Sequence, residues 1–251
     1  MGGQEIMVRF HHHQLKSELL DENAVKTFQT QWNIYRKLVD NNYLSHREAY
    51  GILHSILNDK INRPFSIMDL ACGDAHNTIE CLRGTKVNHY IGIDLSEAAL
   101  KLAEQAVDSL SCTVELEEAD FVNFEEVLDQ PVDVIWIGLS LHHLSVTDKA
   151  RFMAKARNAL NNGGLFLIYE PTGLEDEDRL GYVKRFEQIN EKLWTALTPV
   201  EWNAIIKHVS NCDIPETVST WVKLGREAGF IHCQEMFHDP TGLYSLFLYQ
   251  K

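Results

Sequence analysis

The chain has 251 residues, of which 45% are hydrophobic and 24% charged, with a formal net charge of −13 at pH 7. This composition is typical of a globular protein with a full core, and the negative charge argues against a nucleic-acid backbone as main partner. No apolar run approaches the ~20 residues of a membrane span, and the five cysteines form no Cys-x-x-Cys pair. We therefore expect a cytoplasmic protein that binds neither nucleic acid nor membrane, and the composition leaves its oligomeric state open.

Residues 1–62 are predicted to contain two helices. The first spans about 22–38, where four apolar residues recur at helical spacing: Val25, Phe28, Trp32 and Tyr35. The segment 45–48 has the pattern of a capping box that opens a second helix through Leu57. Before them, residues 11–13 are three consecutive histidines in a polar segment that we expect to be mobile.

Residues 63–170 alternate between strand and helix patterns. The strands are predicted at 66–69, 90–94, 113–116, 132–137 and 165–169. Ser96 and Thr147 are predicted to cap two of the intervening helices, and the second helix is predicted to stop at Gly163. This repetition predicts a parallel sheet with helices on both faces.

Residues 171–216 interrupt that rhythm as a helical insertion. An acidic run at 175–178 is predicted to start one helix, and a capping box at 198–201 to start another. Residues 217–251 then give a closing helix that ends at Gly229 and a hairpin of two strands. We predict one α/β domain with a doubly wound, mostly parallel seven-stranded sheet and a terminal antiparallel hairpin.

The segment 67–74 is the most informative motif. An apolar strand ends near Asp69 and runs into a small-residue turn, and the next strand ends at Asp94, twenty-one residues after Gly73. Such a turn lets the backbone approach a ligand, and the second carboxylate suits ribose hydroxyls. A dinucleotide fingerprint would need glycine where Ala71 and His76 stand, so a nicotinamide oxidoreductase is disfavoured.

The segment resembles the first motif of class I (Rossmann-like) S-adenosylmethionine-dependent methyltransferases, whose pattern is acid-x-Gly-x-Gly-x-Gly. Asp69 and Gly73 match it, while Ala71 and Ala75 stand where that family usually has glycine. The resemblance covers 63–170 as a cofactor-binding core and 217–251 as its closing helix and hairpin. It implies S-adenosylmethionine as the cofactor and a lid role for residues 1–62.

The resemblance also implies cofactor contacts along the carboxyl edge of the sheet. Asp94 would hold the ribose, Asp120 would accept from the adenine amino group with Phe121 packed on the ring, and Arg36 would meet the methionine carboxylate. The full implied set is Asp69, Ala71, Gly73, Asp94, Leu95, Asp120, Phe121, Ser140 and Arg36.

Candidate catalytic residues are His142, Tyr35 and Glu170. A histidine after the fourth strand can act as general base or orient the acceptor, and the choice between His142 and His143 stays open. No metal site is expected, because adjacent histidines do not readily aim at one ion and no His-x-x-x-His spacing exists. Weaker candidates from the second half of the chain are Trp194, His208, Asp213 and Trp221.

The predicted reaction is methyl transfer from S-adenosylmethionine to a small-molecule acceptor by in-line displacement. The alternatives are a methyltransferase acting on a macromolecule, tRNA or protein, and an S-adenosylmethionine-binding protein with altered catalysis. Amino-group nucleic-acid methylases carry Asn/Asp-Pro-Pro-Tyr/Phe after the fourth strand, where residues 138–141 read Gly-Leu-Ser-Leu. That difference favours the small-molecule acceptor.

Overall fold

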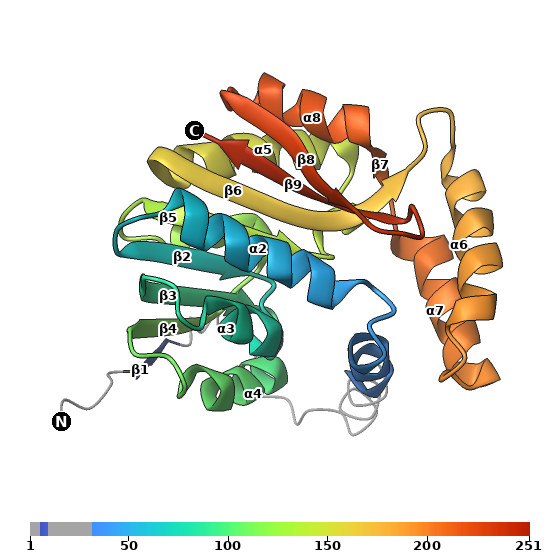
Figure 1. Ribbon diagram of the computed structural model, residues 1–251, viewed down its shortest axis with the longest axis horizontal. Helices are drawn as coiled ribbons and strands as arrows, with labels where there is room; N and C mark the ends of the chain where they lie inside the picture. The colour runs from blue at the N-terminus through green and yellow to red at the C-terminus, as the bar shows by residue number, and fades with distance from the viewer. Residues whose placement is uncertain (1–5, 10–31) are drawn as a thin grey trace, which may run out of the picture.

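A single nine-stranded sheet forms the centre of the part of the chain that the structure describes, residues 6–9 and 32–251 of a computed structural model (Figure 1). The strand order is β1-β4-β3-β2-β5-β6-β9-β8, and β7 pairs with the end of β6. The strands are β1 (Ile6–Arg9), β2 (Phe65–Leu70), β3 (Val87–Asp94), β4 (Thr113–Glu118), β5 (Val132–Gly138), β6 (Leu160–Gly173), β7 (Glu216–Thr217), β8 (His232–His238) and β9 (Tyr244–Gln250).

The strand directions confirm the predicted fold class. All pairs from β1 to β6 are parallel, and β9 runs antiparallel to both of its neighbours, β6 and β8. The sheet has two short strands beyond the seven predicted, because β1 adds to the β4 edge and β7 to the far end of β6.

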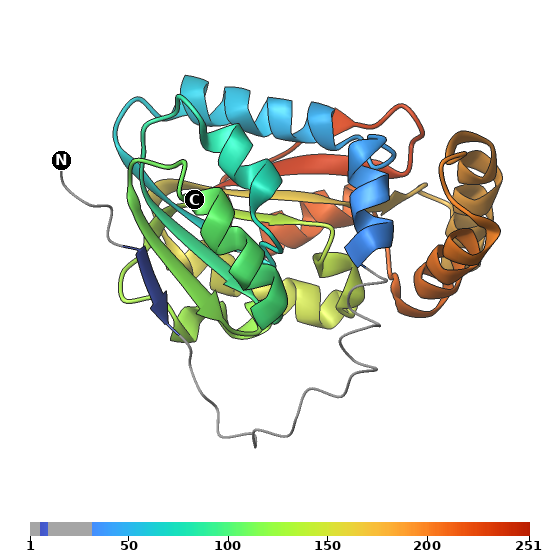
Figure 2. The same ribbon diagram turned by 90° about the horizontal axis from the view of Figure 1, so that it is seen from below.

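Helices cover both faces of the sheet, as Figures 1 and 2 show. One face carries α2 (His46–Lys60), α3 (His76–Leu82) and α4 (Glu97–Val107), and the other carries α5 (Val146–Ala159) and α8 (Val218–Glu227). Each face of the sheet has its own hydrophobic core, and neighbouring strand residues alternate between the two. Ile67 packs in the core beneath α2, α3 and α4, and Met68 packs in the core beneath α5 and α8. Two short 3-10 helices, η1 (Phe121–Glu126) and η2 (Leu141–His143), follow β4 and β5.

Two helical segments from distant parts of the sequence meet beyond the carboxyl ends of the parallel strands. One is the helix over residues 32–40, and the other is the pair α6 (Arg179–Leu193) and α7 (Pro199–Cys212) (Figures 1 and 2). Lys37 forms a 2.6 Å ion pair with Glu201, and the rings of Tyr43 and Trp194 stack with centroids 5.5 Å apart. The insertion and the N-terminal helix therefore lie together at the edge where the predicted site residues gather.

Several predicted helix ends are confirmed and others are wrong. Ser96 and Thr198 cap α4 and α7 with their side chains, and Thr198 completes the predicted capping box. Ser45 has a left-handed backbone and makes no side-chain cap, because its hydroxyl is directed to the carboxylate of Asp239. Asn42 accepts from the amide of Arg47 instead.

The helix α5 differs from the prediction at both ends. Its cap is Ser145, which accepts from the amide of Asp148, and Thr147 lies inside the helix. The helix ends at Ala159, before Gly163, because β6 already begins at Leu160.

Some predicted features lie outside the described residues, namely the histidines at 11–13 and the start of the first helix with Val25 and Phe28. Within the described residues, none of the helices combines the length and the apolar character that crossing a membrane requires.

Candidate functional site

Two adjoining cavities open at the carboxyl ends of β2, β3 and β5. The turn cavity has a volume of about 460 Å³ and is lined by the segment 71–78 together with Asp69 and Asp94. The histidine cavity, of about 340 Å³, lies between the N-terminal helix, η2 and α7. Tyr35, Leu139 and His143 line both cavities, so the two share a wall.

The turn after β2 has an alternating left-handed backbone. Ala71, Gly73 and Ala75 have φ values of 53°, 57° and 56°. This conformation costs an L-residue roughly 1–2 kcal/mol, so the two alanines hold strain that the family's glycines would avoid. A Cβ built on Gly73 would lie 3.8 Å from the Trp32 ring, which means that the turn faces the cavity with its backbone.

Asp94 ties this turn to the start of α4. One carboxylate oxygen accepts from the amide of Gly73 and the other from the amide of Ser96, each at 2.8 Å. Burial raises the pKa of Asp94, and the backbone hydrogen bonds oppose that shift. Each oxygen keeps a further lone pair, so the group can still accept from a ligand in the turn cavity.

Asp69 places a second carboxylate in the same cavity. Its side chain is only 2% exposed and accepts a 2.8 Å hydrogen bond from the hydroxyl of Tyr90. Burial, and then the nearby Asp94 and Asp74, raise its pKa to about 7. A buried carboxylate of this kind favours a ligand that brings a positive charge.

The structure separates the other residues with predicted cofactor contacts. Ser140 lines the turn cavity, whereas Arg36 lines a neighbouring hollow beside Asp74. Leu95 is 64% exposed on the loop that leads into α4 and is not among the residues lining either cavity.

The predicted adenine-binding pair also lies outside both linings. Asp120 caps η1 by accepting from the amide of Val122, and Phe121 packs edge-on against Phe152. The residues that line the turn cavity without having been predicted from the sequence include Tyr50, Thr78 and Trp136. None belongs to a motif, and their helical or strand patterns indicate only core packing.

Glu170 holds the loop after β5 in place. Its carboxylate is fully buried and accepts from the backbone amides of Ser140, Leu141 and His142 at 2.9–3.2 Å. It also lies 2.8 Å from Nδ1 of His142. The expectation that Glu170 receives the acceptor is therefore wrong, because all its contacts are taken within the fold and it lines neither cavity.

The same contacts orient His142. With Nδ1–H donating to Glu170, the Nε2 atom is left as the free ring nitrogen, and the residue lines the histidine cavity. The structure thus distinguishes the two adjacent histidines, because His142 is 5% exposed and held by a carboxylate, while His143 bridges both cavities.

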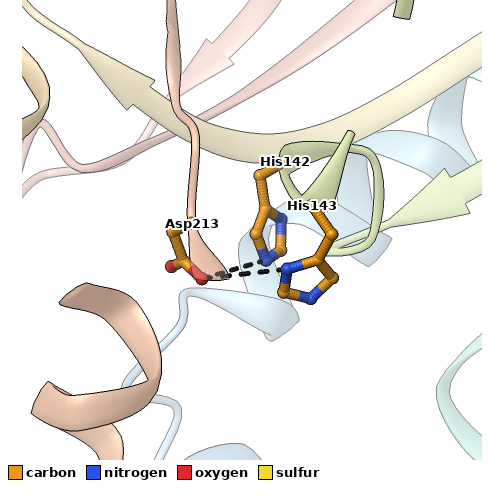
Figure 3. Close-up of side chains that lie close together, drawn as sticks. All are labelled: His142, His143 and Asp213. Atoms are coloured by element: carbon orange, nitrogen blue, oxygen red, sulfur yellow. Dashed lines mark ion pairs between the residues drawn. The ribbon is translucent and has the colours of Figure 1, made fainter. Parts of the chain in front are cut away.

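Asp213 brings a carboxylate from the insertion to these rings (Figure 3). Its Oδ1 atom lies 3.6 Å from Nε2 of His142, 4.0 Å from Nδ1 of His143 and 3.7 Å from Nε2 of His208. Burial raises the pKa of Asp213, and burial lowers the pKa of His143 to about 4. The premise that adjacent histidines do not aim at one point is wrong here, since both rings point toward Asp213.

Tyr35 stands in the wall between the cavities. Its hydroxyl lies 3.2 Å from Nε2 of His46, and its ring is 5.8 Å from that of Trp32. Burial, followed by the charges of Asp74 and Asp69, raises the pKa of Tyr35 above its ordinary value. The residue is thus a neutral hydroxyl at physiological pH, beside both ligand spaces.

The chain is similar to known proteins in sequence and in structure. Residues 67–164 match the family model described as a methyltransferase domain. An uncharacterized methyltransferase of Bacillus cereus is 25% identical over 164 residues, which cover 64% of this chain and 73% of the relative. A similar protein of Bacillus mycoides is 24% identical over the same length.

Solved structures share the fold at low identity. Human N-acetylserotonin methyltransferase, solved in complex with S-adenosylmethionine, superposes with a TM-score of 0.55 at 16% identity, covering 87% of this chain and 55% of that one. An O-methyltransferase family 2 protein from Planctomyces limnophilus, in complex with apigenin, gives 0.57 at 18% identity and covers 87% and 61%. The chain thus spans little more than half the length of these two structures.

Proposed function

We propose that this chain, which is a class I S-adenosylmethionine-dependent methyltransferase, methylates a small molecule held in the histidine cavity. The observation behind this proposal is the shared wall of the two cavities. The turn cavity is lined by three carboxylates and a left-handed turn. The histidine cavity is lined by aromatic and aliphatic side chains together with histidines and Asp213. A cofactor and an acceptor would meet at this wall, which is formed by Tyr35, Leu139 and His143.

The residues of the turn cavity suit S-adenosylmethionine. A volume of about 460 Å³ falls within the range of small-molecule sites. Asp94 would accept from the ribose hydroxyls, the Gly73 backbone would let the ligand approach, and the buried Asp69 would face its positive charge. When bound, the cofactor supplies a methyl group on a sulfonium that is already activated for displacement.

His142 would act on the acceptor as a general base. Glu170 fixes the tautomer by binding Nδ1, which leaves Nε2 to accept a proton from a hydroxyl in the histidine cavity. Glu170 is a positioning residue in this scheme, since it contacts His142 and the loop amides but lines neither cavity. Tyr35 would orient the acceptor from the shared wall.

The acceptor would be an apolar or aromatic molecule that carries a hydroxyl. Phe186, Trp194 and Tyr244 line the histidine cavity and would bury such a ring, while the polar groups gather at the His142 end. A neutral hydroxyl must lose a proton during methylation, which gives the His142–Glu170 pair a purpose. The O-methyltransferase structures with a similar fold favour the same acceptor atom.

A screen with methyl-labelled S-adenosylmethionine tests this proposal. Cell extract would be separated into small metabolites, RNA and protein, and each fraction incubated with the enzyme. Label is expected in the small-molecule fraction and should depend on His142. Label that enters RNA or protein, or transfer that His142→Gln leaves unchanged, would contradict the proposal.

A further inference from the structure

Three side chains around the histidine cavity are arranged as ligands around a common point. His142 and His143 come from η2 in the core, and Asp213 comes from the end of α7, seventy residues later in the sequence. One ligand atom from each lies within 4.8 Å of the other two, and Figure 3 shows both rings pointing toward the carboxylate.

The spacing fits a cation between them. Nitrogen and oxygen ligands bind zinc at ~2.0–2.2 Å, so two of them at a tetrahedral angle are ~3.4 Å apart. The observed separations from Oδ1 of Asp213 are 3.6 Å to His142 and 4.0 Å to His143. These distances are too long for hydrogen bonds but need only a small contraction to hold a metal ion.

Asp213 itself has an unexplained atom. Its Oδ1 is fully buried and has no hydrogen-bond partner within the described part of the chain. A buried carboxylate oxygen of this kind costs free energy unless something binds it. The oxygen faces the imidazoles, so the missing partner belongs between the three side chains.

The fold holds Asp213 in place from its backbone. Its carbonyl accepts from Nε of Arg179, and the next amide, that of Ile214, donates to the carbonyl of His142 at 2.8 Å. The buried Lys149 side chain binds the carbonyl of Ile214 and pairs with Glu216 at 2.8 Å. These contacts fix the carboxylate beside η2 without using the carboxylate.

A further carboxylate holds one of the three proposed ligands, His142, in position. Metal-binding histidines usually donate their other ring N–H to a carboxylate or carbonyl, which fixes the ring and raises its basicity. Nδ1 of His142 lies 2.8 Å from Glu170, leaving Nε2 toward the common point. His208 adds a third imidazole, with Nε2 3.7 Å from the same oxygen.

We propose that His142, His143 and Asp213 bind a divalent transition-metal ion of the zinc type at the edge of the histidine cavity. Two imidazoles with one carboxylate select such an ion over magnesium or calcium, which prefer oxygen ligands. Three protein ligands leave a coordination position for water or, if the proposed function holds, for the acceptor oxygen. The ion and a proton would compete for Nε2 of His142, so the metal-bound protein would not use His142 as the general base of the proposed function.

Cobalt(II) is a suitable probe, because its visible spectrum reports tetrahedral nitrogen and oxygen ligands. The test uses the full chain with His11→Gln, His12→Gln and His13→Gln, which remove a competing histidine run. One cobalt ion per chain is expected, with a dissociation constant of about 1 µM or tighter. Zinc should displace it and magnesium should not.

Single substitutions then assign the site. His143→Ala and Asp213→Asn should each weaken cobalt binding by more than the ~10–100-fold typical of losing a supporting partner. The exposed His232, on β8, provides the control His232→Ala, which should bind normally. Asp213→Asn keeps the side-chain shape, so it guards against loss of binding through misfolding.

The proposal is overturned if the chain takes up no stoichiometric cobalt, if both variants bind as tightly as the parent, or if magnesium competes equally. Calorimetry of S-adenosylmethionine binding to the same proteins distinguishes failure of the metal site from failure of the proposed function. Cofactor binding without metal binding would remove the metal site alone. Metal binding without cofactor binding would remove the methyltransferase assignment of the turn cavity alone.

Discussion

Oε2 of Glu170 lies 2.8 Å from Nδ1 of His142, and the same carboxylate accepts three backbone amides of the loop that carries the histidine. One side chain thus fixes both the path of the loop and the tautomer of the ring. The substitution Glu170→Gln separates the two roles in part. The amide oxygen can still accept from the backbone of Ser140 and Leu141, while the amide nitrogen places a donor at Nδ1 and gives up the bond from the His142 amide.

Glu170→Gln should therefore lower turnover with little change in cofactor affinity. The new N–H would favour the tautomer with hydrogen on Nε2, which is unable to accept a proton, so the loss should approach the ~10²–10⁴-fold worth of a general base. Turnover and cofactor affinity would be measured across pH, with the exposed Glu187→Gln as control. An unchanged rate and pH profile would mean that Glu170 serves only the loop.

Asp94→Asn should weaken S-adenosylmethionine binding by about 10–100-fold. Charge-assisted hydrogen bonds contribute ~1.5–3 kcal/mol, and the substitution also weakens the bonds that Asp94 accepts from Gly73 and Ser96. Calorimetry measures the affinity, and the exposed Asp108→Asn at the end of α4 is the matched control. Normal affinity in folded Asp94→Asn would place the ribose elsewhere.

Cofactor binding should release protons from Asp69 near neutral pH. Burial raises the pKa of this carboxyl to about 7, so a cationic ligand must displace the proton it carries at lower pH. Affinity should rise between about pH 6 and 8, by at most about tenfold per pH unit. Calorimetry in two buffers of different ionisation enthalpy counts the protons, and Asp69→Asn should show no such release.

Protein stability should fall with acid partly through His46. Burial lowers the pKa of this ring to about 4, so the folded chain keeps it neutral while the unfolded chain protonates it below about pH 6.5. The unfolded state therefore binds more protons between about pH 6.5 and 4, and stability declines as pH falls through that window. His46→Gln should reduce the slope by up to about 1.4 kcal/mol per pH unit, measured by urea unfolding. Equal slopes would show that His46 titrates normally.

Trp194 should contribute more than the Lys37–Glu201 ion pair to holding the insertion against the N-terminal segment. Its ring stacks on Tyr43 and packs against Phe186 and Trp202, whereas the Lys37–Glu201 pair is partly exposed. Removing a buried tryptophan costs about 3–5 kcal/mol, and an exposed pair is worth about 0.2–1 kcal/mol. Hydrogen exchange over 179–212 should accelerate strongly in Trp194→Ala and little in Lys37→Ala. The reverse order would contradict this account.

The core of the fold could be predicted because its signals are local. Two apolar strand patterns that end near Asp69 and Asp94, with a small-residue turn after the first, are enough to predict which edge of the sheet carries the turn cavity. The cap predictions failed at Ser45 and Thr147 because another side chain accepts from the first turn in each case, that of Asn42 in α2 and that of Ser145 in α5.

The arrangement around His142 depends on contacts that spacing does not encode. Asp213 comes from the insertion. Its position follows from the contacts that the backbone of the next residue, Ile214, makes with His142 and Lys149. Glu170 was expected to face the acceptor because it follows a strand at the right edge. The η2 loop folds its amides onto that carboxylate and removes it from the cavity.

The Lys149 contact has a consequence for chimeric proteins. Lys149 belongs to α5 and is fully buried, and it binds the last residues of the insertion, Ile214 and Glu216, rather than its helices α6 and α7. A graft that exchanges residues 180–212 for a foreign loop and retains Arg179 and 213–217 should keep Asp213 beside the two histidines. The range of acceptors could then be changed by exchanging the loop, while His142, His143 and Asp213 keep their arrangement.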